Sequence, residues 1–321
     1  MYRLGIDLGG TNIVAGVVDE NYSILSKSDC KTSVPRPETD ICDSMTQMAL
    51  DAIEKAGLTI DNIESVGIGV PGACNPETGI IEYSANLFFH NWHIVEMMED
   101  KLQKNVVIEN DANAAAYGEY LAGAAEGAKN AVVITLGTGI GAGIIIDGKI
   151  YSGSNYAGAE MGHMVIVYDG NKCACGRKGC WETYASASGL ITLTKSAILR
   201  EKPDYSYMLK TCDGDINKVN GITAFRAMRA GDPLATEVVD EFIRYLACGI
   251  TNAINIFQPD ILCIGGGISN EGQALLSPLN SIIEEERYTK HNHKQTIICQ
   301  AALGNDAGII GAAFLNNKQN C

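Results

Sequence analysis

The fold is decided by Leu4–Asp19, LGIDLGGTNIVAGVVD, which returns without a gap as Val132–Asp147, VVITLGTGIGAGIIID. Each copy is an apolar run, a glycine turn carrying Thr and a second apolar run, which is the pattern of a β-hairpin. Two related hairpins predict two related domains facing a shared cleft, where backbone N–H groups and hydroxyls hold a nucleotide's phosphates from both sides. The alternative is two ordinary buried hairpins whose glycines only make tight turns. The acid in the first tip, Asp7, favours the phosphate site.

The composition is that of a large globular protein and excludes several classes. The chain has 321 residues, 46% of them hydrophobic, with a mean hydropathy of +0.03, which allows two domains with sizeable cores. No apolar run reaches the length of a membrane span and no signal peptide is apparent, so we expect a cytoplasmic protein with no membrane partner. The net charge of −14 argues against nucleic acid as a partner, because phosphate backbones require clustered Lys and Arg.

Hydrophobic periodicity predicts an α/β organisation, with a hinge between two halves that no Pro- or Ser-rich linker separates. We expect a small N-terminal domain of residues 1–111 plus 305–321, and a large C-terminal domain of residues 112–304 that carries the metal site described below. The expected strands are residues 3–8, 12–18, 64–70, 106–109 and 261–264, and a hairpin is expected over 131–146. Helices are expected at 39–56, at 112–123, from Asp232-Pro233 onward and at 306–315. The last of these helices is expected to pack back on the first domain.

A candidate metal site follows the second hairpin. His163 precedes Cys173, Cys175 and Cys180 in the pattern H-x9-C-x-C-x4-C. One neutral imidazole and three thiolates form a tetrahedral zinc set, and four protein ligands leave no open position for water, so a zinc ion here is expected to be structural. The alternative is unrelated free thiols. The other cysteines are expected to be small buried residues or reduced thiols.

Two glutamates flank this cluster. Glu160 lies in Glu160-Met161-Gly162-His163, and Glu182 follows the last Cys by two residues. A carboxylate can accept hydrogen bonds from two vicinal hydroxyls of a sugar, so the pair suits recognition of a polar ligand. The alternative is that both are solvated surface residues.

The catalytic candidate is Asp111, at the end of an apolar strand and the start of an Ala-rich helix. Ligands of α/β sheets bind at such strand ends. Taken alone, Asp111 fits a helix N-cap better than a base. Its place between the two glycine hairpins instead favours a base that accepts a hydroxyl proton as the oxygen attacks a γ-phosphate.

Together these residues resemble the sugar kinases of the ROK family (repressor, open reading frame, kinase), in the actin-like ATPase-domain superfamily. The resemblance covers essentially the whole chain. It is carried by Asp7-Leu8-Gly9-Gly10-Thr11, Gly69-Val70-Pro71-Gly72, Glu109-Asn110-Asp111-Ala112-Asn113, Leu136-Gly137-Thr138-Gly139-Ile140-Gly141, Glu160-x-Gly162-His163, the cysteine loop through Glu182, and Gly265-Gly266-Gly267.

The resemblance implies a two-domain, duplicated actin-like (ribonuclease H-like) ATPase fold with an interdomain active-site cleft. It also implies a homodimer and ATP-dependent phosphorylation of a hexose at the 6-hydroxyl with Mg²⁺, with Asp111 as the base and Asp7 orienting Mg²⁺ through water. The residues implied at the sugar are Gly72, Asn110, Asp111, Glu160, His163 and Glu182. Those implied at the nucleotide are Asp7, Gly9, Gly10, Thr11, Asn12, Thr138, Gly139, Gly265, Gly266 and Gly267. No G-x-x-x-x-G-K-[ST] sequence occurs, so the ATP site is not a P-loop.

One segment departs from the family pattern and leaves the sugar open. Many family members have Pro-Gly-Trp after an Asn-Leu pair, whereas this chain has Asn86-Leu87 followed by Phe88–His93, FFHNWH. A bulkier pocket rim is expected, although His90 and His93 fit exposed loop side chains better than ligands. Glucose is the leading substrate, and N-acetylmannosamine or N-acetylglucosamine is the alternative. A ROK sugar-responsive repressor is not expected, because it needs a DNA-binding module and a basic face.

Overall fold

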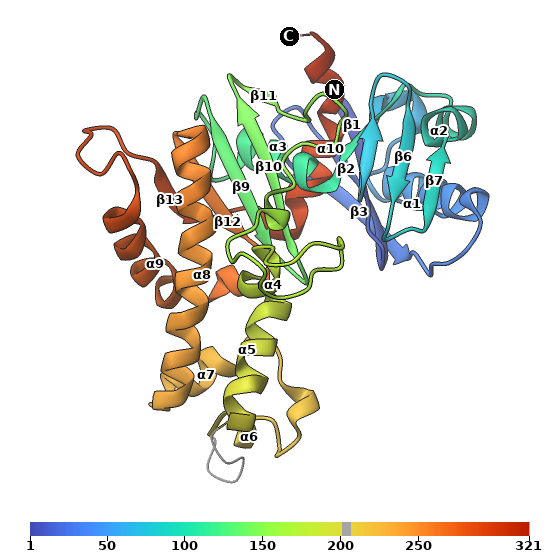
Figure 1. The fold of residues 1–321 in the computed structure, drawn as a ribbon. Coiled ribbons are helices and arrows are strands. Elements are labelled where there is room, and N and C mark those ends of the chain that lie inside the picture. The colour runs from blue at the N-terminus through green and yellow to red at the C-terminus, as the bar shows by residue number, and fades with distance from the viewer. Residues whose placement is uncertain (201–206, 321) are drawn as a thin grey trace. The chain divides into compact units, whose positions relative to one another are not determined.

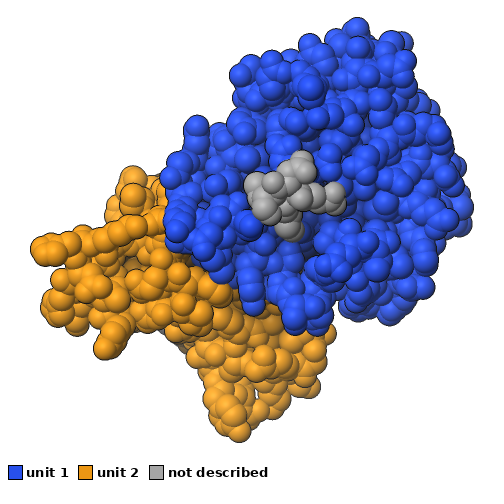
Figure 2. Space-filling model, turned by 90° about the horizontal axis from the view of Figure 1, so that it is seen from above, with its two compact units in different colours: residues 1–133, 143–159, 301–321 blue, residues 134–142, 160–300 orange. Residues whose placement is uncertain are grey.

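The computed structural model describes residues 1–200 and 207–320 of the chain, in two compact units. Unit 1 comprises Met1–Val133, Gly143–Ala159 and Ala301–Cys321, and unit 2 comprises Ile134–Ala142 and Glu160–Gln300 (Figure 2). The chain therefore passes between the units at four places. The elements within each unit are coloured along the sequence in Figure 1.

Unit 1 contains a five-stranded sheet in the order β3-β2-β1-β4-β8. Its first three strands are antiparallel, while β4 and β8 run parallel to β1. The strands are β1 Tyr2–Leu8, β2 Asn12–Val18, β3 Ile24–Lys31, β4 Ile63–Val70 and β8 Val106–Asn110. These bounds confirm the expected strands to within a residue at each end. The parallel strand β4 is buried on both faces, as its nearly continuous apolar sequence indicates.

Helices and a small sheet complete unit 1. Helix α1 contacts β2 and β3, and its predicted apolar stripe, including Ile41, Met45 and Ala49, is buried in the core. Strands β5, β6 and β7 form a second, three-stranded antiparallel sheet. The remaining bounds are α1 Glu38–Lys55, β5 Ala73–Asn75, β6 Ile80–Ser84, β7 Phe89–Trp92, α2 Ile94–Leu102, α3 Asp111–Ala122 and α10 Ala307–Ala313.

The C-terminal helix α10 packs on α3, β1 and β4, which confirms the predicted return of the chain to its first domain. Small residues make this contact possible. A Cβ atom at Gly5 would lie 2.0 Å from the carbonyl oxygen of Ile309, and one at Gly67 would lie 1.8 Å from that of Ala312. The strand backbones and the helix therefore touch directly, and a side chain at either glycine would force them apart.

A second five-stranded sheet has the order β11-β10-β9-β12-β13. Its strands are β9 Ala131–Leu136, β10 Ile140–Ile146, β11 Lys149–Ile150, β12 Ile261–Gly265 and β13 Ile297–Gln300. The second glycine hairpin, β9–β10, is therefore present as predicted. The helices of unit 2 are α4 Glu182–Ala185, α5 Ala187–Arg200, α6 Tyr207–Lys210, α7 Thr223–Arg229, α8 Pro233–Phe257 and α9 Gln273–Glu286.

The long helix α8 begins where the sequence places it. The Asp232 carboxylate accepts hydrogen bonds from the backbone N–H groups of Leu234 and Ala235 at 2.9 and 3.3 Å, and Pro233 occupies the first turn. Its apolar face is buried, and Phe242 packs edge-on against Phe225 of α7. Among the helices in the described ranges, none is both long and apolar enough to cross a bilayer.

Candidate active site and metal centre

Asp111 is the first residue of α3, but it is not the helix cap. Asn110 is the cap, because its side-chain oxygen accepts from the N–H groups of Ala112 and Asn113 at 2.9 and 3.2 Å. The Asp111 carboxylate adds one local hydrogen bond, from Ala112 N–H at 2.9 Å. The capping role that the sequence alone favours for Asp111 therefore belongs to its neighbour, and Asp111 is left with further acceptor positions for a ligand.

Two carboxylates lie near each other at the carboxyl ends of β1 and β8, the two strands that flank β4. Asp7 of β1 pairs in register with Gly69 of β4, which pairs with Glu109 of β8, two residues before Asp111. Burial, and next the negative charge of Asp111, raises the pKa of Asp7 from 3.8 to about 6. Burial likewise raises the pKa of Asp111, although backbone N–H groups oppose the rise. The ionised form of each carboxyl is therefore destabilised, and a bound cation or a proton would offset this cost.

A fully buried glutamate fixes the catalytic segment. Glu109 accepts hydrogen bonds from the N–H of Asn110, the amide of Asn113 and the hydroxyl of Ser152, each at 3.1 Å. It therefore ties the start of α3 to the loop after β11. In the sequence, Glu109 is identified only as part of a motif. The available signal was an acid placed inside an apolar strand, where an unpaired charge would be costly.

The first hairpin tip is held from outside by Thr32, a residue that the motifs did not identify. Its hydroxyl donates to the carbonyl of Gly9 at 2.6 Å, and its N–H donates to the carbonyl of Thr11 at 2.9 Å. Thr32 is wholly buried, whereas Thr11 is exposed. The side chain of Asn12 accepts from the Lys31 ammonium at 2.8 Å. The tip is thus held on one side, and the Thr11 side chain is left exposed.

Gly72 and Asn110 contact each other. The Asn110 amide donates to the carbonyl of Gly72 at 3.1 Å, and its second amide hydrogen remains for a ligand. Gly72 has φ of 123°, and a Cβ there would lie 2.2 Å from the carbonyl oxygen of Tyr83. Only glycine fits this position, which brings the predicted sugar loop against the catalytic segment.

Unit 2 brings the second hairpin tip, the triple glycine and Glu182 together. A Cβ at Gly139 would lie 2.4 Å from the Glu182 Oε2 atom. Gly266, with φ of 86°, lies so close to β9 that a Cβ would fall 2.3 Å from the carbonyl oxygen of Leu136. Thr138 lies between these contacts on the tip. This arrangement suits recognition of a nucleotide by the backbone. The glycines of the tip and of the loop have no side chains, so a ligand can approach the backbone N–H groups at both places.

The predicted metal ligands converge. The ligand atoms of His163, Cys173, Cys175 and Cys180 all lie within 4.8 Å of one another. The distances from Cys173 Sγ to His163 Nδ1 and from Cys175 Sγ to Cys180 Sγ are both 3.6 Å. A tetrahedron with zinc–sulfur bonds of about 2.3 Å and a zinc–nitrogen bond of about 2.0 Å has edges of roughly 3.5–3.8 Å. The four groups therefore fit a zinc ion.

Both glutamates lie beside this cluster. Glu182 Oε1 is 3.0 Å from Cys173 Sγ and 3.5 Å from His163 Nδ1, so its carboxylate lies between the metal ligands and the hairpin tip. Glu160 Oε2 is 3.9 Å from His163 Nε2 and is 59% exposed. His163 thus turns Nδ1 toward the thiols and Nε2 toward Glu160, which leaves Nε2 and the Glu160 carboxylate on an accessible side.

The predicted site residues fall into two groups. Unit 1 brings together Asp7, Gly9, Gly10, Thr11, Asn12, Gly72, Asn110 and Asp111. Unit 2 brings together Thr138, Gly139, Glu160, His163, Cys173, Cys175, Cys180, Glu182, Gly265, Gly266 and Gly267. That the two groups serve one reaction stays a prediction.

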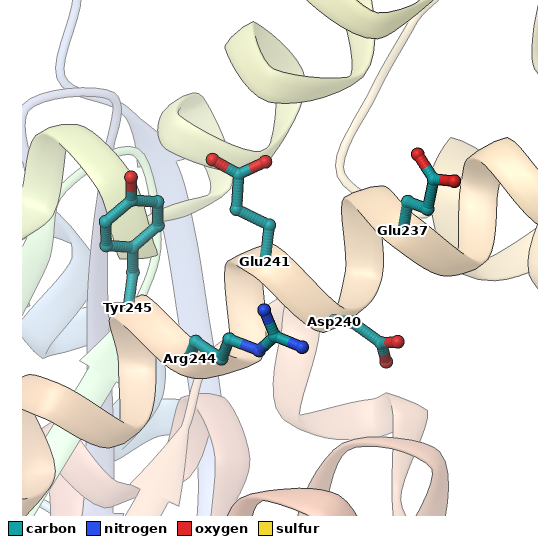
Figure 3. Close-up of a pocket in the computed structure, with 5 residues that line it drawn as sticks. All are labelled: Glu237, Asp240, Glu241, Arg244 and Tyr245. Atoms are coloured by element: carbon teal, nitrogen blue, oxygen red, sulfur yellow. The ribbon is translucent and has the colours of Figure 1, made fainter.

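A surface depression of about 510 Å³ lies along α8 and contains none of these residues. Figure 3 shows its five lining side chains, which all project from that one helix: Glu237, Asp240, Glu241, Arg244 and Tyr245. The carbonyl of Tyr245 accepts from the indole N–H of Trp181 at 2.9 Å, and its ring lies 4.7 Å from that of Tyr184. Tyr245 thus supports the segment after the last metal ligand.

Comparison with known proteins gives one consistent answer. The family model described as the ROK family matches residues 3–319. The chain is 36% identical to the glucokinase of Streptomyces coelicolor over 312 residues, which is 97% of this chain and 96% of that enzyme. The crystal structure of a ROK family glucokinase from Streptomyces griseus, in complex with glucose and AMPPNP, superposes with a TM-score of 0.82 at 35% identity, over 98% of this chain and 99% of that one.

Some of the more distant relatives are repressors. The xylose repressor of Bacillus spizizenii is 29% identical over 315 residues, which is 98% of this chain but 76% of the repressor. The chain is thus more similar in sequence to the glucokinase than to the repressor, and the match covers more of the glucokinase's length.

Proposed function

Because the chain belongs to the ROK family, with the mixed α/β architecture of its glucokinases, we propose that it is an ATP-dependent kinase that phosphorylates the 6-hydroxyl of a hexose, glucose first of all. The observation that carries the proposal is the position and environment of Asp111. This residue lies at the end of β8 and the start of α3, it is freed from capping by Asn110, and burial raises its pKa.

Asp111 acts as the general base. As the sugar O6 attacks the γ-phosphorus, the O6–H proton passes to the Asp111 carboxylate, the new O6–P bond forms, and the bond from phosphorus to the β–γ bridging oxygen breaks to release ADP. A raised pKa makes the carboxylate a stronger base at neutral pH, which brings it closer to the ideal for proton transfer. Glu109 keeps the segment in place through its three hydrogen bonds.

Asp7 and Asp111 suit a magnesium ion held through water. Burial and the charge of Asp111 destabilise the ionised Asp7 carboxylate and raise its pKa. A divalent cation beside it would stabilise the ionised form. Mg²⁺ would neutralise charge on the transferred phosphate. The phosphates would contact Gly9, Gly10, Thr11 and Asn12 on one side and Thr138 and Gly139 on the other, with the adenosine near Gly265–Gly267.

The sugar would be held by Gly72, Asn110, Glu160, His163 and Glu182. A structural zinc ion on His163, Cys173, Cys175 and Cys180 would fix His163 through Nδ1, so that its other edge and the two glutamates keep their positions toward the hydroxyls. The proposal includes domains of residues 1–111 plus 305–321 and 112–304 around an interdomain cleft, a homodimer, and a cytoplasmic location.

An ADP-release assay coupled to pyruvate kinase and lactate dehydrogenase tests the proposal across glucose, mannose, fructose, N-acetylglucosamine and N-acetylmannosamine. We expect glucose to give the highest kcat/KM, with glucose 6-phosphate as the product identified by phosphorus NMR. ADP release with none of the sugars would refute the kinase. A higher kcat/KM for an N-acetylated sugar would replace glucose as the substrate while retaining the enzyme class.

A further inference from the structure

The tip of the β6–β7 hairpin, residues 85–88, is here named the rim loop. Ser84 pairs with Phe89 at the base of the loop, so it is a tight four-residue connection. It occupies the place where this chain departs from the Pro-Gly-Trp turn of the family. None of its residues takes part in the mechanism given above.

The residue before the rim loop contacts the predicted sugar loop, which is in turn hydrogen-bonded to the catalytic segment. A Cβ at Gly72 would lie 3.0 Å from Cα of Ser84, the residue immediately before the rim loop. The same glycine accepts a hydrogen bond from Asn110, which precedes Asp111. Two contacts, both within unit 1, therefore link the base of the rim loop to Asn110, the residue that precedes the predicted catalytic carboxylate.

The rim loop itself lies beside the predicted phosphate hairpin. A Cβ at Gly10 would lie 3.5 Å from both the Cβ and the carbonyl oxygen of Asn86. The hairpin thus lies next to Gly10 through Asn86 and next to Gly72 through Ser84. These two glycines belong to the segments predicted to contact the nucleotide and the sugar, respectively.

Phe88 is the unusual residue of the loop. Its φ is 63°, a left-handed conformation that a bulky side chain rarely adopts, and 68% of its surface is exposed. Its neighbours are anchored: Leu87 and Trp92 are wholly buried, and the Phe89 ring lies 4.8 Å from that of Trp92. The loop therefore buries Leu87 and leaves the Phe88 ring exposed, in a strained backbone conformation, within the segment that adjoins Gly10 and Gly72.

We propose that Phe88 determines sugar affinity by packing its ring against the apolar C–H face of the bound hexose. A pyranose with equatorial hydroxyls presents such a face, and an aromatic ring covers it while leaving the hydroxyls to the polar groups. In this proposal the left-handed backbone of Phe88 directs its exposed ring toward the sugar. This inference rests on the proposed kinase activity, and it adds a binding role to a residue outside the catalytic segment.

The test compares Phe88→Ala and Phe88→Trp with the unmodified enzyme, using glucose or whichever panel sugar that enzyme phosphorylates best. Phe88→Ala should raise the KM for the sugar and its dissociation constant in calorimetry by about tenfold, with kcat and the KM for ATP within twofold. Phe88→Trp keeps an aromatic ring and should therefore retain most of the affinity for the sugar. Asn91→Gly is the matched control, because Asn91 has φ of 56° on the same hairpin and is exposed, but carries no ring.

The outcomes separate the two proposals. Activity of the unmodified enzyme toward a sugar, with sugar KM values of Phe88→Ala within twofold of it, would overturn the role of Phe88 and leave the kinase intact. An equal rise of KM in Asn91→Gly would also overturn it, since the effect would then belong to the backbone of the hairpin. No activity toward any sugar would refute the kinase and the sugar contact together.

Discussion

Asp7→Asn should stabilise the protein while abolishing its function. The substitution keeps the size of the side chain and removes a charge that the folded state holds at a cost. Burial and the charge of Asp111 move the pKa of Asp7 from 3.8 to about 6. Because a tenfold change in an acid constant corresponds to about 1.4 kcal/mol, this carboxylate costs the folded state about 3 kcal/mol at neutral pH.

The sign of the effect fixes its pH dependence. The folded-state pKa of Asp7 lies above its unfolded value, so between pH 3.8 and about 6 the folded protein binds more protons than the unfolded chain. Stability from this group is therefore greatest below pH 3.8, declines as the pH rises to about 6, and is constant above that. The gain from Asp7→Asn should be absent near the lower limit, rise through this window and reach about 3 kcal/mol above it.

Urea denaturation of both proteins, without Mg²⁺ or nucleotide, measures the difference at each pH. Asp29→Asn on the exposed side of β3 is the control, because it removes an equal formal charge without relieving burial. Adding Mg²⁺ should narrow the gap, because the cation stabilises only the protein that retains the carboxylate. The reasoning is refuted if Asp7→Asn is no more stable than the unmodified protein at pH 8, or if its advantage is the same at every pH.

Three further substitutions test the site. Asp111→Asn should lower kcat by about 10²- to 10⁴-fold in the coupled assay with little change in sugar affinity by calorimetry, and near-normal turnover would exclude it as the base. Cys175→Ser should remove about one zinc ion per chain by elemental analysis, whereas Cys248→Ser should keep it; unchanged zinc in the first variant would reject the metal site. Gly139→Ala would place a Cβ 2.4 Å from Glu182 Oε2, so kcat/KM should fall at least tenfold. A kcat/KM within twofold of the unmodified enzyme would show that the hairpin tip accommodates the methyl group without loss of activity.

Several features could be predicted from the sequence because they depend on local spacing and residue type. The paired glycine hairpins, the Asp232-Pro233 start of α8 and the return of residues 306–315 onto the first strands are all present in the structure. The four predicted metal ligands also follow from spacing, since nine residues lie between His163 and Cys173 and a short glycine-containing turn brings the remaining two cysteines close.

Tertiary structure alone decided the electrostatics of the site. The order β1-β4-β8 brings Asp7 near Asp111, and no spacing along the chain indicates that burial, and next the charge of Asp111, raises the pKa of Asp7. Likewise, Asn110 rather than Asp111 caps α3, and Thr32 pins a hairpin tip that lies twenty or more residues earlier. Secondary structure follows from short-range periodicity, whereas burial and through-space contact depend on which distant strands pair, and the chain does not encode that pairing in any local pattern.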